Sequence, residues 1–398
     1  MKTIMILGAS ILQLPAIKKA KEMGLRVVAV DMNPEAVGFK EDGIIKEVIS
    51  TIDIPNVVKA AKRHKVDGVM TLASDMPMRS VAAVAKEMGL VGISDETALK
   101  ATNKAVMRQA LYEHGVPVPR FYKVSNREEY GKATAEFHVP FIVKPADNSG
   151  SRGIFKISDL NDQQTIRDAY DYSRASSRSG DVVVEEYMEG PEVSVETLTV
   201  DGECHVIQIT DKLTTGAPHF VEMGHSQPTQ LDTVTAEKIR EVAKAANKAI
   251  GIENGPSHTE IIVTEEGPKI VELGARLGGD CITTHLVPLS TGVDMVECCI
   301  KIALGEKPDI TPKWSKGSAI RYFNQKAGLI KKIDGITDAR NIAGVREVAI
   351  VHGVGERITE VTDSASRMGF VIAQENNAKN AIHTCNSVLK IIDVEIGE

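Results

Sequence analysis

The sequence predicts an α/β protein with a Rossmann-like parallel sheet at its N-terminus and a small strand-rich domain at its C-terminus. Two patterns support this: apolar strands alternate with amphipathic helices over residues 1–95, and hairpin signals follow further along the chain. Alternating strands and helices indicate βαβ units, in which the strands run parallel. A chain of 398 residues is also too long for one ordinary core, so we expect several domains.

The elements of the N-terminal region are indicated one by one. In chain order they are the strand TIMILGA, the helix LPAIKKAKEMG, the strands RVVAVD and VDGVMTLA, the helix SVAAVAKEMG and the strand VGI. Residues 95–115 have a helical pattern closed by Gly115, and they connect this region to the next. The middle region contains a hairpin turned at Asp201-Gly202 and a long amphipathic helix, TAEKIREVAKAANKAIG.

Composition excludes several classes of protein. The net charge is −7 and aromatic residues make up 4%, so neither a basic nucleic-acid surface nor a stacking platform for single strands is expected. Five cysteines at irregular spacing fit neither a zinc site nor a disulfide framework and favour a reducing compartment. No apolar run approaches the length of a membrane span. We therefore expect a cytoplasmic protein.

A hairpin that carries two glutamates is the strongest chemical signal. If residues 265–267 form a three-residue loop, Thr264 pairs with Pro268, and Glu260 stands opposite Glu272 on one face. Like charges in that position destabilise a sheet, and a cation between them removes the conflict. Mg²⁺ commonly takes one or two carboxylates together with substrate phosphates. A register slipped by one residue would instead leave an ordinary solvated face.

Residues near this hairpin extend the candidate site. His258 lies on the same face as Glu260 by strand parity and is a neighbour of the site rather than an expected ligand. Arg276 follows Glu272 by four residues, and its guanidinium can bind a phosphate or carboxylate with two hydrogen bonds. Gly278 and Gly279 next to it permit close backbone approach. A turn with an exposed arginine is the alternative.

Two further segments carry weaker signals. Lys144 ends an apolar strand before a small polar loop, residues 147–153, whose backbone N–H groups could bind phosphates although no P-loop motif is present. Glu185 and Glu186 end a Val-rich strand before Gly190-Pro191, a hinge-like stretch whose backbone could bind adenine. Taken alone, these segments are more simply a turn and a charged loop.

Together, and in this order, the segments resemble the ATP-grasp superfamily over nearly the whole chain. The chain looks like the carboxylate–amine ligases that include L-amino-acid ligases and, more distantly, biotin carboxylase and the synthetase halves of carbamoyl-phosphate synthase. The resemblance implies a two-part α+β ATP-grasp clamp after the N-terminal domain. It also implies an ADP-forming ligase that converts a carboxylate, such as an amino acid, to an acyl phosphate and joins it to an amine.

The resemblance assigns roles to residues of this chain. The residues it places at ATP are Lys104, Lys144, Ser149, Gly150, Ser151, Gly153, Glu185, Glu186, Tyr187, Met188 and Glu192. Those it places at Mg²⁺ or Mn²⁺ are Glu260 and Glu272. It places Arg276 at the acyl phosphate, and Lys212, Glu222, His225, Ser74 and Asp75 on the substrate side. With the neighbours singled out above, we expect Arg276, Lys212 and His258 at the reacting groups, and Ser74, Asp75, Glu222, His225, Arg276, Gly278 and Gly279 at the substrate. Many family members have Asn where this chain has Gly274, so a third metal ligand is in doubt.

The resemblance also suggests a division into domains. We expect a pre-ATP-grasp domain over residues 1–95, an ATP-grasp domain over 96–306 with a mobile lid at about 117–188, and an α/β domain over 307–398. The expected partners are small-molecule carboxylates and amines, with neither nucleic acid nor a membrane. A homodimer is expected from the resemblance alone.

Three other interpretations remain open. A nicotinamide-dependent enzyme would use Gly8 and Asp31, but the turn GASILQ lacks the second and third glycines of the dinucleotide motif. A non-catalytic ATP-binding protein would not need the carboxylate pair and Arg276. A carboxylase or purine-type ligase of the same superfamily would use bicarbonate or glycine, and the sequence does not separate it from an amino-acid ligase.

Overall fold

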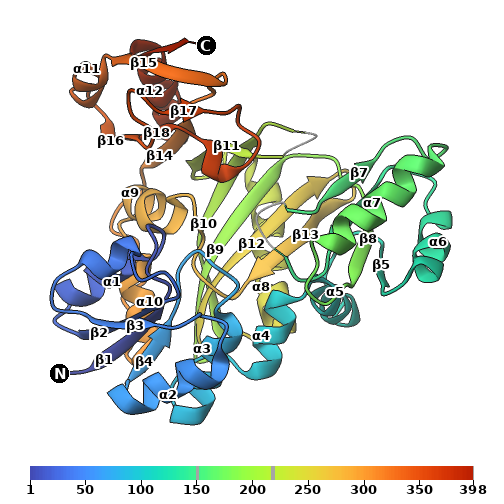
Figure 1. Cartoon of the computed structure of the whole chain (residues 1–398), viewed down its shortest axis with the longest axis horizontal. Helices are drawn as coiled ribbons and strands as arrows, with labels where there is room; N and C mark the ends of the chain where they lie inside the picture. The colour runs from blue at the N-terminus through green and yellow to red at the C-terminus, as the bar shows by residue number, and fades with distance from the viewer. Residues whose placement is uncertain (149–151, 217–219, 398) are drawn as a thin grey trace.

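The computed structural model describes residues 1–148, 152–216 and 220–397, and the strands in these ranges form four sheets. Figure 1 shows the largest sheet at the centre, with the N-terminal sheet at the lower left, a smaller sheet at the right and the C-terminal part at the top. The α/β class, the parallel N-terminal sheet and the small C-terminal strand region are all confirmed.

The N-terminal sheet is parallel throughout, with strand order β3-β2-β1-β4. Its strands are β1 (Thr3–Leu7), β2 (Arg26–Asp31), β3 (Ile45–Val48) and β4 (Gly68–Met70), and its helices are α1 (Leu14–Glu22), α2 (Ile54–His64) and α3 (Met78–Met88). One predicted strand is absent, because residues 91 and 92 form a bend and residue 93 is not in a strand. The short, half-exposed β3 was not predicted, because its edge position removes the apolar run of a buried strand.

The helical connector after this sheet is divided into two helices. α4 (Asp95–Thr102) ends before Asn103, whose backbone is extended at φ −131° and ψ 110°, and α5 (Lys104–Glu113) begins directly after it. The Asn103 side chain accepts hydrogen bonds from the N–H groups of Ala105 and Val106, both at 3.1 Å. This N-cap fixes the start of α5 and with it the direction of Lys104.

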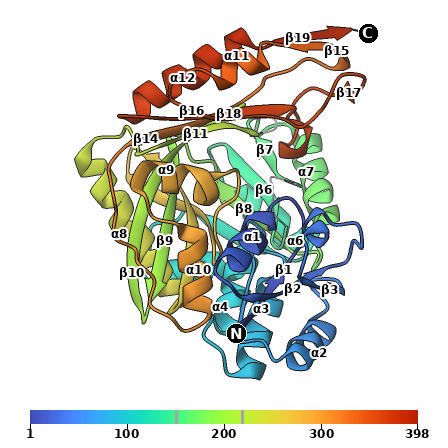
Figure 2. The same cartoon turned by 90° about the vertical axis from the view of Figure 1, so that its left-hand side faces the viewer.

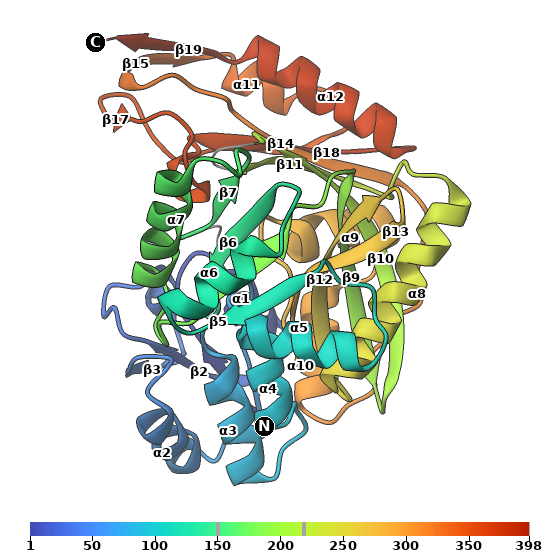
Figure 3. The same ribbon diagram turned by 90° about the vertical axis from the view of Figure 1, so that its right-hand side faces the viewer.

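The smaller sheet is antiparallel, with strand order β5-β8-β6-β7. Its strands are β5 (Phe121–Val124), β6 (Phe141–Pro145), β7 (Phe155–Ile157) and β8 (Val182–Glu186), covered by α6 (Arg127–Ala135) and α7 (Gln163–Ala175). An aromatic core that includes Tyr130, Phe137 and Tyr170 lies between these helices and the sheet. Figure 3 shows this unit as a separate layer beside the large sheet.

The large sheet is antiparallel and has the strand order β13-β12-β9-β10-β11-β14-β18-β16. Its strands are β9 (Glu192–Val200), β10 (Glu203–Thr214), β11 (Glu222–Gln227), β12 (Gly255–Thr264), β13 (Gly267–Gly274), β14 (Gly317–Tyr322), β16 (Val345–Ile350) and β18 (Gly369–Glu375). As expected, β9 and β10 form a hairpin through Asp201 (φ 50°) and Gly202 (φ 80°), a pair that suits a tight turn of two left-handed residues. The long helix α8 (Thr233–Ile250) packs against β10 and β13.

Strands from the C-terminal part continue the large sheet. β14, β18 and β16 extend it beyond β11, and α12 (Ala378–Ile391) packs on β14 and β18. The remaining C-terminal elements are α9 (Val287–Thr291), α10 (Met295–Ala303), β15 (Gly328–Asp334), α11 (Ile336–Arg340), β17 (Arg357–Ile358) and β19 (Asp393–Gly397). Figure 2 shows α11, α12, β15 and β19 stacked above this shared sheet.

Shared cores connect the parts. Met5 and Leu7 of β1 belong to the same buried cluster as Val193 of β9 and Ile261 of β12. Ile6 of β1 belongs to a second cluster, which reaches the C-terminal strands. Among the described residues, no helix combines the length and apolar character needed to cross a membrane.

Candidate active site

A central cavity of about 830 Å³ brings together residues from all parts of the chain. Its lining includes Ser74 and Asp75 after β4, Lys104 at the start of α5, and Ser364 from the C-terminal part. The strands β9 to β13 supply the charged side chains Glu192, Lys212, Glu222, Glu260 and Glu272. Nearly every residue singled out from the sequence that the structure describes therefore lies at this cavity or directly behind its wall.

The two glutamates of the hairpin stand opposite each other, as predicted, but the loop length and register that bring them together differ from the prediction. β12 and β13 pair Thr264 with Gly267, so the loop is shorter by one residue than the three-residue loop we expected. A β-bulge at Val271 then shifts the register, and Glu260 pairs with Glu272. Without the bulge, the short loop would have placed the two side chains on opposite faces. Both carboxylates line the cavity.

Each glutamate is held by a buried lysine. Lys104 Nζ lies 2.7 Å from Glu272 Oε1 and 2.8 Å from the carbonyl oxygen of Asn148. Lys212 Nζ lies 3.2 Å from Glu260 Oε1 and 2.5 Å from Glu192 Oε1. Burial opposes the charge on Lys212, but the surrounding carboxylates outweigh it and hold the pKa of Lys212 well above its usual range. The cavity therefore contains fixed cations next to fixed carboxylates.

Lys144 belongs to a second buried ionic group. Its Nζ lies 2.6 Å from Glu185 Oε2, while Arg108 Nε donates to Glu185 Oε1 at 2.6 Å. Burial lowers the pKa of Lys144. It opposes ionisation of Glu185 too, yet Arg108 and Lys144 bring the pKa of Glu185 down to about 2. Arg108 also donates to the carbonyl oxygen of Val271 at 2.5 Å and so supports the bulge.

His258 is held in place by a glutamate that the sequence did not indicate. Its Nδ1 lies 2.5 Å from Oε1 of the fully buried Glu196, and its Nε2 lies 3.5 Å from Glu260 Oε1. Burial disfavours the imidazolium, but Glu196 outweighs it and raises the pKa of His258 to about 9. A Cβ at Gly278 would come within 2.7 Å of His258 Nδ1, which explains why this position has no side chain.

Arg276 connects the hairpin to the N-terminal sheet. Its Nε lies 2.9 Å from Asp75 Oδ1, and its Nη2 lies 3.0 Å from Asp75 Oδ2. Next to it, Leu277 forms a parallel β-bridge with Leu72. The predicted substrate residues Ser74 and Asp75 thus lie beside Arg276, although they are about 200 positions away in the sequence.

The other predicted substrate residues lie on β11. Glu222 lines the cavity, and its carboxylate lies 3.8 Å from Lys212 Nζ. It also accepts a hydrogen bond from the Ser364 hydroxyl at 3.4 Å. His225 is buried, with 1% of its surface exposed, and its Nε2 lies 3.4 Å from Asp280 Oδ2. Asp280 and Gly279 also line the cavity. This end of the cavity is therefore polar and bounded by the N-terminal sheet, β11 and the C-terminal part.

The hinge and glycine-loop predictions have mixed outcomes. Tyr187, Met188 and Glu192 line the cavity, whereas Glu185 lies behind its wall. The N–H groups of Glu186 and Tyr187 donate to the carbonyl oxygens of Arg120 and Pro140, both at 2.9 Å, which leaves neither of them for a purine ring. Gly153 packs against Ser176 rather than in the cavity lining. The predicted phosphate-loop residues Ser149, Gly150 and Ser151 lie outside the described residues.

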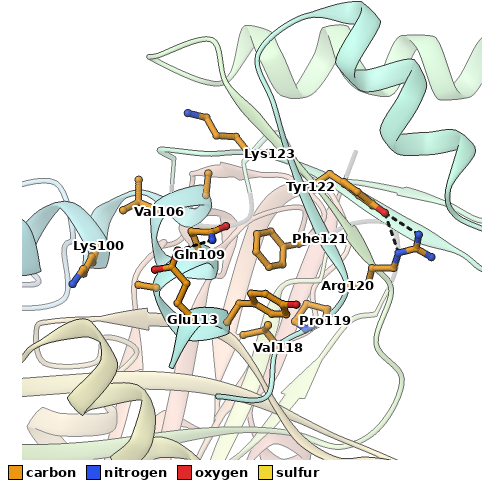
Figure 4. A pocket seen from close by; sticks show the side chains of 13 residues that line it. Lys100, Val106, Gln109, Glu113, Val118, Pro119, Arg120, Phe121, Tyr122 and Lys123 are labelled. Carbon is orange, nitrogen blue, oxygen red and sulfur yellow. Dashed lines mark hydrogen bonds between the residues drawn. The ribbon is translucent and has the colours of Figure 1, made fainter. Parts of the chain in front are cut away.

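A second cavity of about 820 Å³ lies beside α5, and none of the site residues predicted from the sequence lines it (Figure 4). Val106, Gln109 and Glu113 of α5 line it, whereas Lys104 and Arg108 of the same helix point to the central site. In Figure 4, Arg120 bonds the Tyr122 hydroxyl and Gln109 bonds Glu113, so these polar groups already have partners.

The donor set of the central cavity fits magnesium and a triphosphate. Within the described residues no group of three or more His, Cys, Asp and Glu side chains gathers as a complete metal cage. Mg²⁺ does not require one, because it usually takes one or two carboxylates and completes its shell with phosphate oxygens and water. Lys212 and His258 hold the pKa of Glu260 well below its usual value in spite of burial, so the Glu260 carboxylate is ionised. The observed pair Glu260 and Glu272 meets this requirement.

Comparisons with known proteins agree with this arrangement. The ATP-grasp domain model matches residues 137–284, and that of L-amino acid ligase C-terminal domain 2 matches residues 321–397. The L-arginine-specific L-amino acid ligase of Bacillus subtilis is 30% identical over 308 residues, which span 74% of this chain and 72% of that protein. The chain therefore belongs to the ATP-grasp superfamily, whose members use ATP with Mg²⁺. Within it, the chain is an ATP-dependent ligase of the L-amino-acid-ligase-like group.

Solved structures of low identity support the same fold. The L-amino acid ligase of Bacillus licheniformis superposes with a TM-score of 0.85 at 22% identity, covering 100% of this chain and 99% of that one. The biotin carboxylase domain of 2-oxoglutarate carboxylase from Hydrogenobacter thermophilus, solved with MgADP, ADP and bicarbonate, gives 0.79 at 19% identity. That match covers 100% of this chain and 91% of the other.

Proposed function

We propose that this protein phosphorylates a small carboxylate, such as an amino acid, to an acyl phosphate and joins it to an amine, releasing ADP and phosphate. One observation carries the proposal: Glu260 and Glu272 face each other in a cavity that also holds Lys104, Lys144 and Arg276. Phosphoryl transfer depends on positioning and charge neutralisation, and this set supplies both. The similarity to a ligase specific for L-arginine supports an amino acid as one substrate.

The proposed roles follow the position of each side chain in the cavity. Glu260 and Glu272 would hold Mg²⁺, which when bound neutralises the phosphate charge. Lys104 and Lys144 would contact phosphate oxygens, since both side chains line the cavity. Arg276 would bind the carboxylate and stabilise the negative charge that develops on the acyl oxygen when the amine attacks, because Asp75 fixes its guanidinium at the polar end.

The reaction balances in two steps. A carboxylate oxygen attacks the γ-phosphorus of ATP, the bond to the bridging oxygen breaks, and ADP leaves. The amine nitrogen then attacks the acyl carbon, phosphate leaves, and the nitrogen loses a proton. Because water would hydrolyse the acyl phosphate, the cavity must close around it. We expect the smaller sheet, which contributes Lys144 to the cavity lining, to make that movement.

Hydroxylamine trapping tests the proposal. The full-length protein with Mg·ATP and hydroxylamine is screened against the amino acids and other small carboxylic acids for ADP release and hydroxamate. We expect hydroxamate with one acid or a small set of acids, and Glu272→Gln is expected to abolish both products. Glu265→Gln, on the exposed turn of the same hairpin, is the matched control and should keep full activity. ADP release that depends on bicarbonate alone would contradict the proposal and favour a carboxylase.

A further inference from the structure

The loop that follows the β12–β13 hairpin adopts an unfavourable backbone conformation at two of its residues. Asp280 and Cys281 have φ values of 48° and 61°, so two consecutive non-glycine residues lie in the left-handed region. Such a conformation is unfavourable for a residue with a side chain and persists only when its surroundings enforce it. Asp280 lines the central cavity, four positions after Arg276. The contacts that enforce this conformation therefore shape the polar end of the cavity.

On one side the loop is attached to the N-terminal sheet. Arg276 contacts Asp75 at 2.9 Å, and Leu277 accepts a hydrogen bond from the Ala73 N–H at 3.2 Å. The carbonyl oxygen of Gly278 accepts from Thr283 Oγ1 at 2.7 Å. These contacts hold the first half of the loop but not the carboxylate of Asp280.

On the other side a single residue of the C-terminal part holds Asp280. Arg367 Nη1 and Nη2 donate to Asp280 Oδ2 and Oδ1, each at 2.8 Å. This two-bond arrangement matches the planar fork of arginine and is not available to lysine. Burial would raise the pKa of Asp280, but Arg367 and His225 hold it well below its usual value.

The guanidinium of Arg367 is itself fixed on all sides. Its Nε donates to the carbonyl oxygen of Ser364 and its Nη1 to that of Glu222, both at 2.9 Å. Its Cζ lies 3.7 Å from the ring centroid of Tyr322, and the residue is 8% exposed. Arg367 thus connects the loop, β11 and the C-terminal part at one point.

We propose that Arg367 is a positioning residue: by holding Asp280 it fixes the loop from Gly278 to Cys281, so that the C-terminal part sets the affinity for the substrate carboxylate. A buried ion pair is by itself weak evidence for stability, but it does specify one geometry. The loop forms the polar end of the cavity, whereas Lys104, Lys144 and Met188 lie elsewhere along its lining. The loss of Arg367 should therefore affect the carboxylate substrate and leave Mg·ATP binding intact.

The structural half of this proposal is tested without any substrate. Hydrogen exchange of the full-length protein is measured over residues 278–286 in wild type, in Arg367→Lys and in Asp280→Asn. We expect both variants to exchange faster there, by about tenfold for Arg367→Lys, because local opening is no longer opposed by the paired bonds. Arg346→Lys is the matched control, since Arg346 donates only to Gln374 Oε1, at 2.7 and 3.1 Å, within the C-terminal part. Wild-type exchange in both variants would overturn the proposal.

The kinetic half rests on the proposed function. With the acid that forms hydroxamate, we expect Arg367→Lys to raise KM for that acid about tenfold and to leave KM for ATP within about twofold. An equal rise in both constants would show that the effect is not confined to the acid, and would overturn a role of Arg367 in positioning the acid site. If wild type forms no hydroxamate with any acid, the proposed function fails, while the exchange measurement still decides whether Arg367 holds the loop.

A paired variant separates positioning from the effect of an unpaired charge. Asp280→Asn combined with Arg367→Met removes both charges and so avoids an uncompensated ion. We expect the melting temperature of the double variant to be closer to wild type than that of either single variant. Its KM for the acid should stay raised, and its hydrogen exchange over residues 278–286 should stay fast. Recovery of all three quantities would mean that only the unpaired charge mattered, and would overturn the proposal.

Discussion

Glu185 is a buried carboxylate whose ionisation depends on two cationic partners. It is 4% exposed and lies between Arg108 and Lys144, which hold its pKa near 2 although burial would raise it. The sequence placed Glu185 at a hinge but did not reveal this role. Arg108 could have been noticed, since it follows Lys104 by four residues and shares its helix face. Arg367 and Asp280 had no comparable signal, because nothing local relates residues 87 positions apart.

Stability should therefore depend on the ionisation of Glu185. Because its pKa is lower in the folded state than the usual 4.5, its contribution is present above that pH and is lost as the pH falls to about 2. The shift corresponds to about 3 kcal/mol. We expect Glu185→Gln to lower the melting temperature at neutral pH, and the difference from wild type to shrink as the solution is acidified.

The neighbouring Glu186 provides the control for this measurement. Among the described residues its carboxylate contacts only the N–H of Arg120, at 3.5 Å, so Glu186→Gln should change the melting temperature little at any pH. A difference between Glu185→Gln and wild type that stays constant between neutral pH and about pH 3 would contradict the assigned ionisation.

At the scale of elements, the β12–β13 hairpin shows how far a single sequence can be read. The alternation of its residues correctly predicted that Glu260 and Glu272 share a face. The loop length and the bulge were not predictable, since a shorter loop plus a bulge at Val271 gives the same pairing as a longer loop without one. The bulge depends on a hydrogen bond from α5, a distant element.

Arg108 should thus be needed for the geometry of the hairpin. Arg108→Met removes its bonds to Glu185 and to the Val271 carbonyl, leaving a buried carboxylate with one fewer partner. We expect a loss of about 3–5 kcal/mol in the free energy of unfolding and a raised KM for ATP. Gln109→Ala removes only an exposed bond to Glu113 on the same helix and should change neither quantity. Equal effects of the two variants, measured by urea unfolding and ATP titration, would contradict this role.

At the scale of the whole molecule, the parallel N-terminal sheet and the strand-rich C-terminus followed from periodicity. The continuation of the large sheet from β11 into β14, β18 and β16 did not, because strand order is set by long-range pairing. The central cavity is a product of that order. It joins Ser74 of the N-terminal part, the hairpin, and Ser364 of the C-terminal part.

A ligand that fills this cavity should stabilise the whole chain. Binding at about 100 times Kd adds about 2.7 kcal/mol to the free energy of unfolding. We expect Mg·ATP to raise the melting temperature, chelation of Mg²⁺ to remove most of the increase, and NADH to give none. In the double variant Glu260→Gln, Glu272→Gln, the part of the increase that depends on Mg²⁺ should vanish. A shift with NADH as large as that with Mg·ATP would favour a dinucleotide enzyme instead.

Oxygen transfer tests the central claim most directly. The acid identified by trapping is labelled with ¹⁸O in its carboxylate, and the phosphate released with its amine partner is analysed by ³¹P NMR. An acyl phosphate intermediate requires one carboxylate oxygen to leave with the phosphate, so we expect one ¹⁸O per phosphate formed. Unlabelled phosphate at full turnover would show that the carboxylate is never phosphorylated.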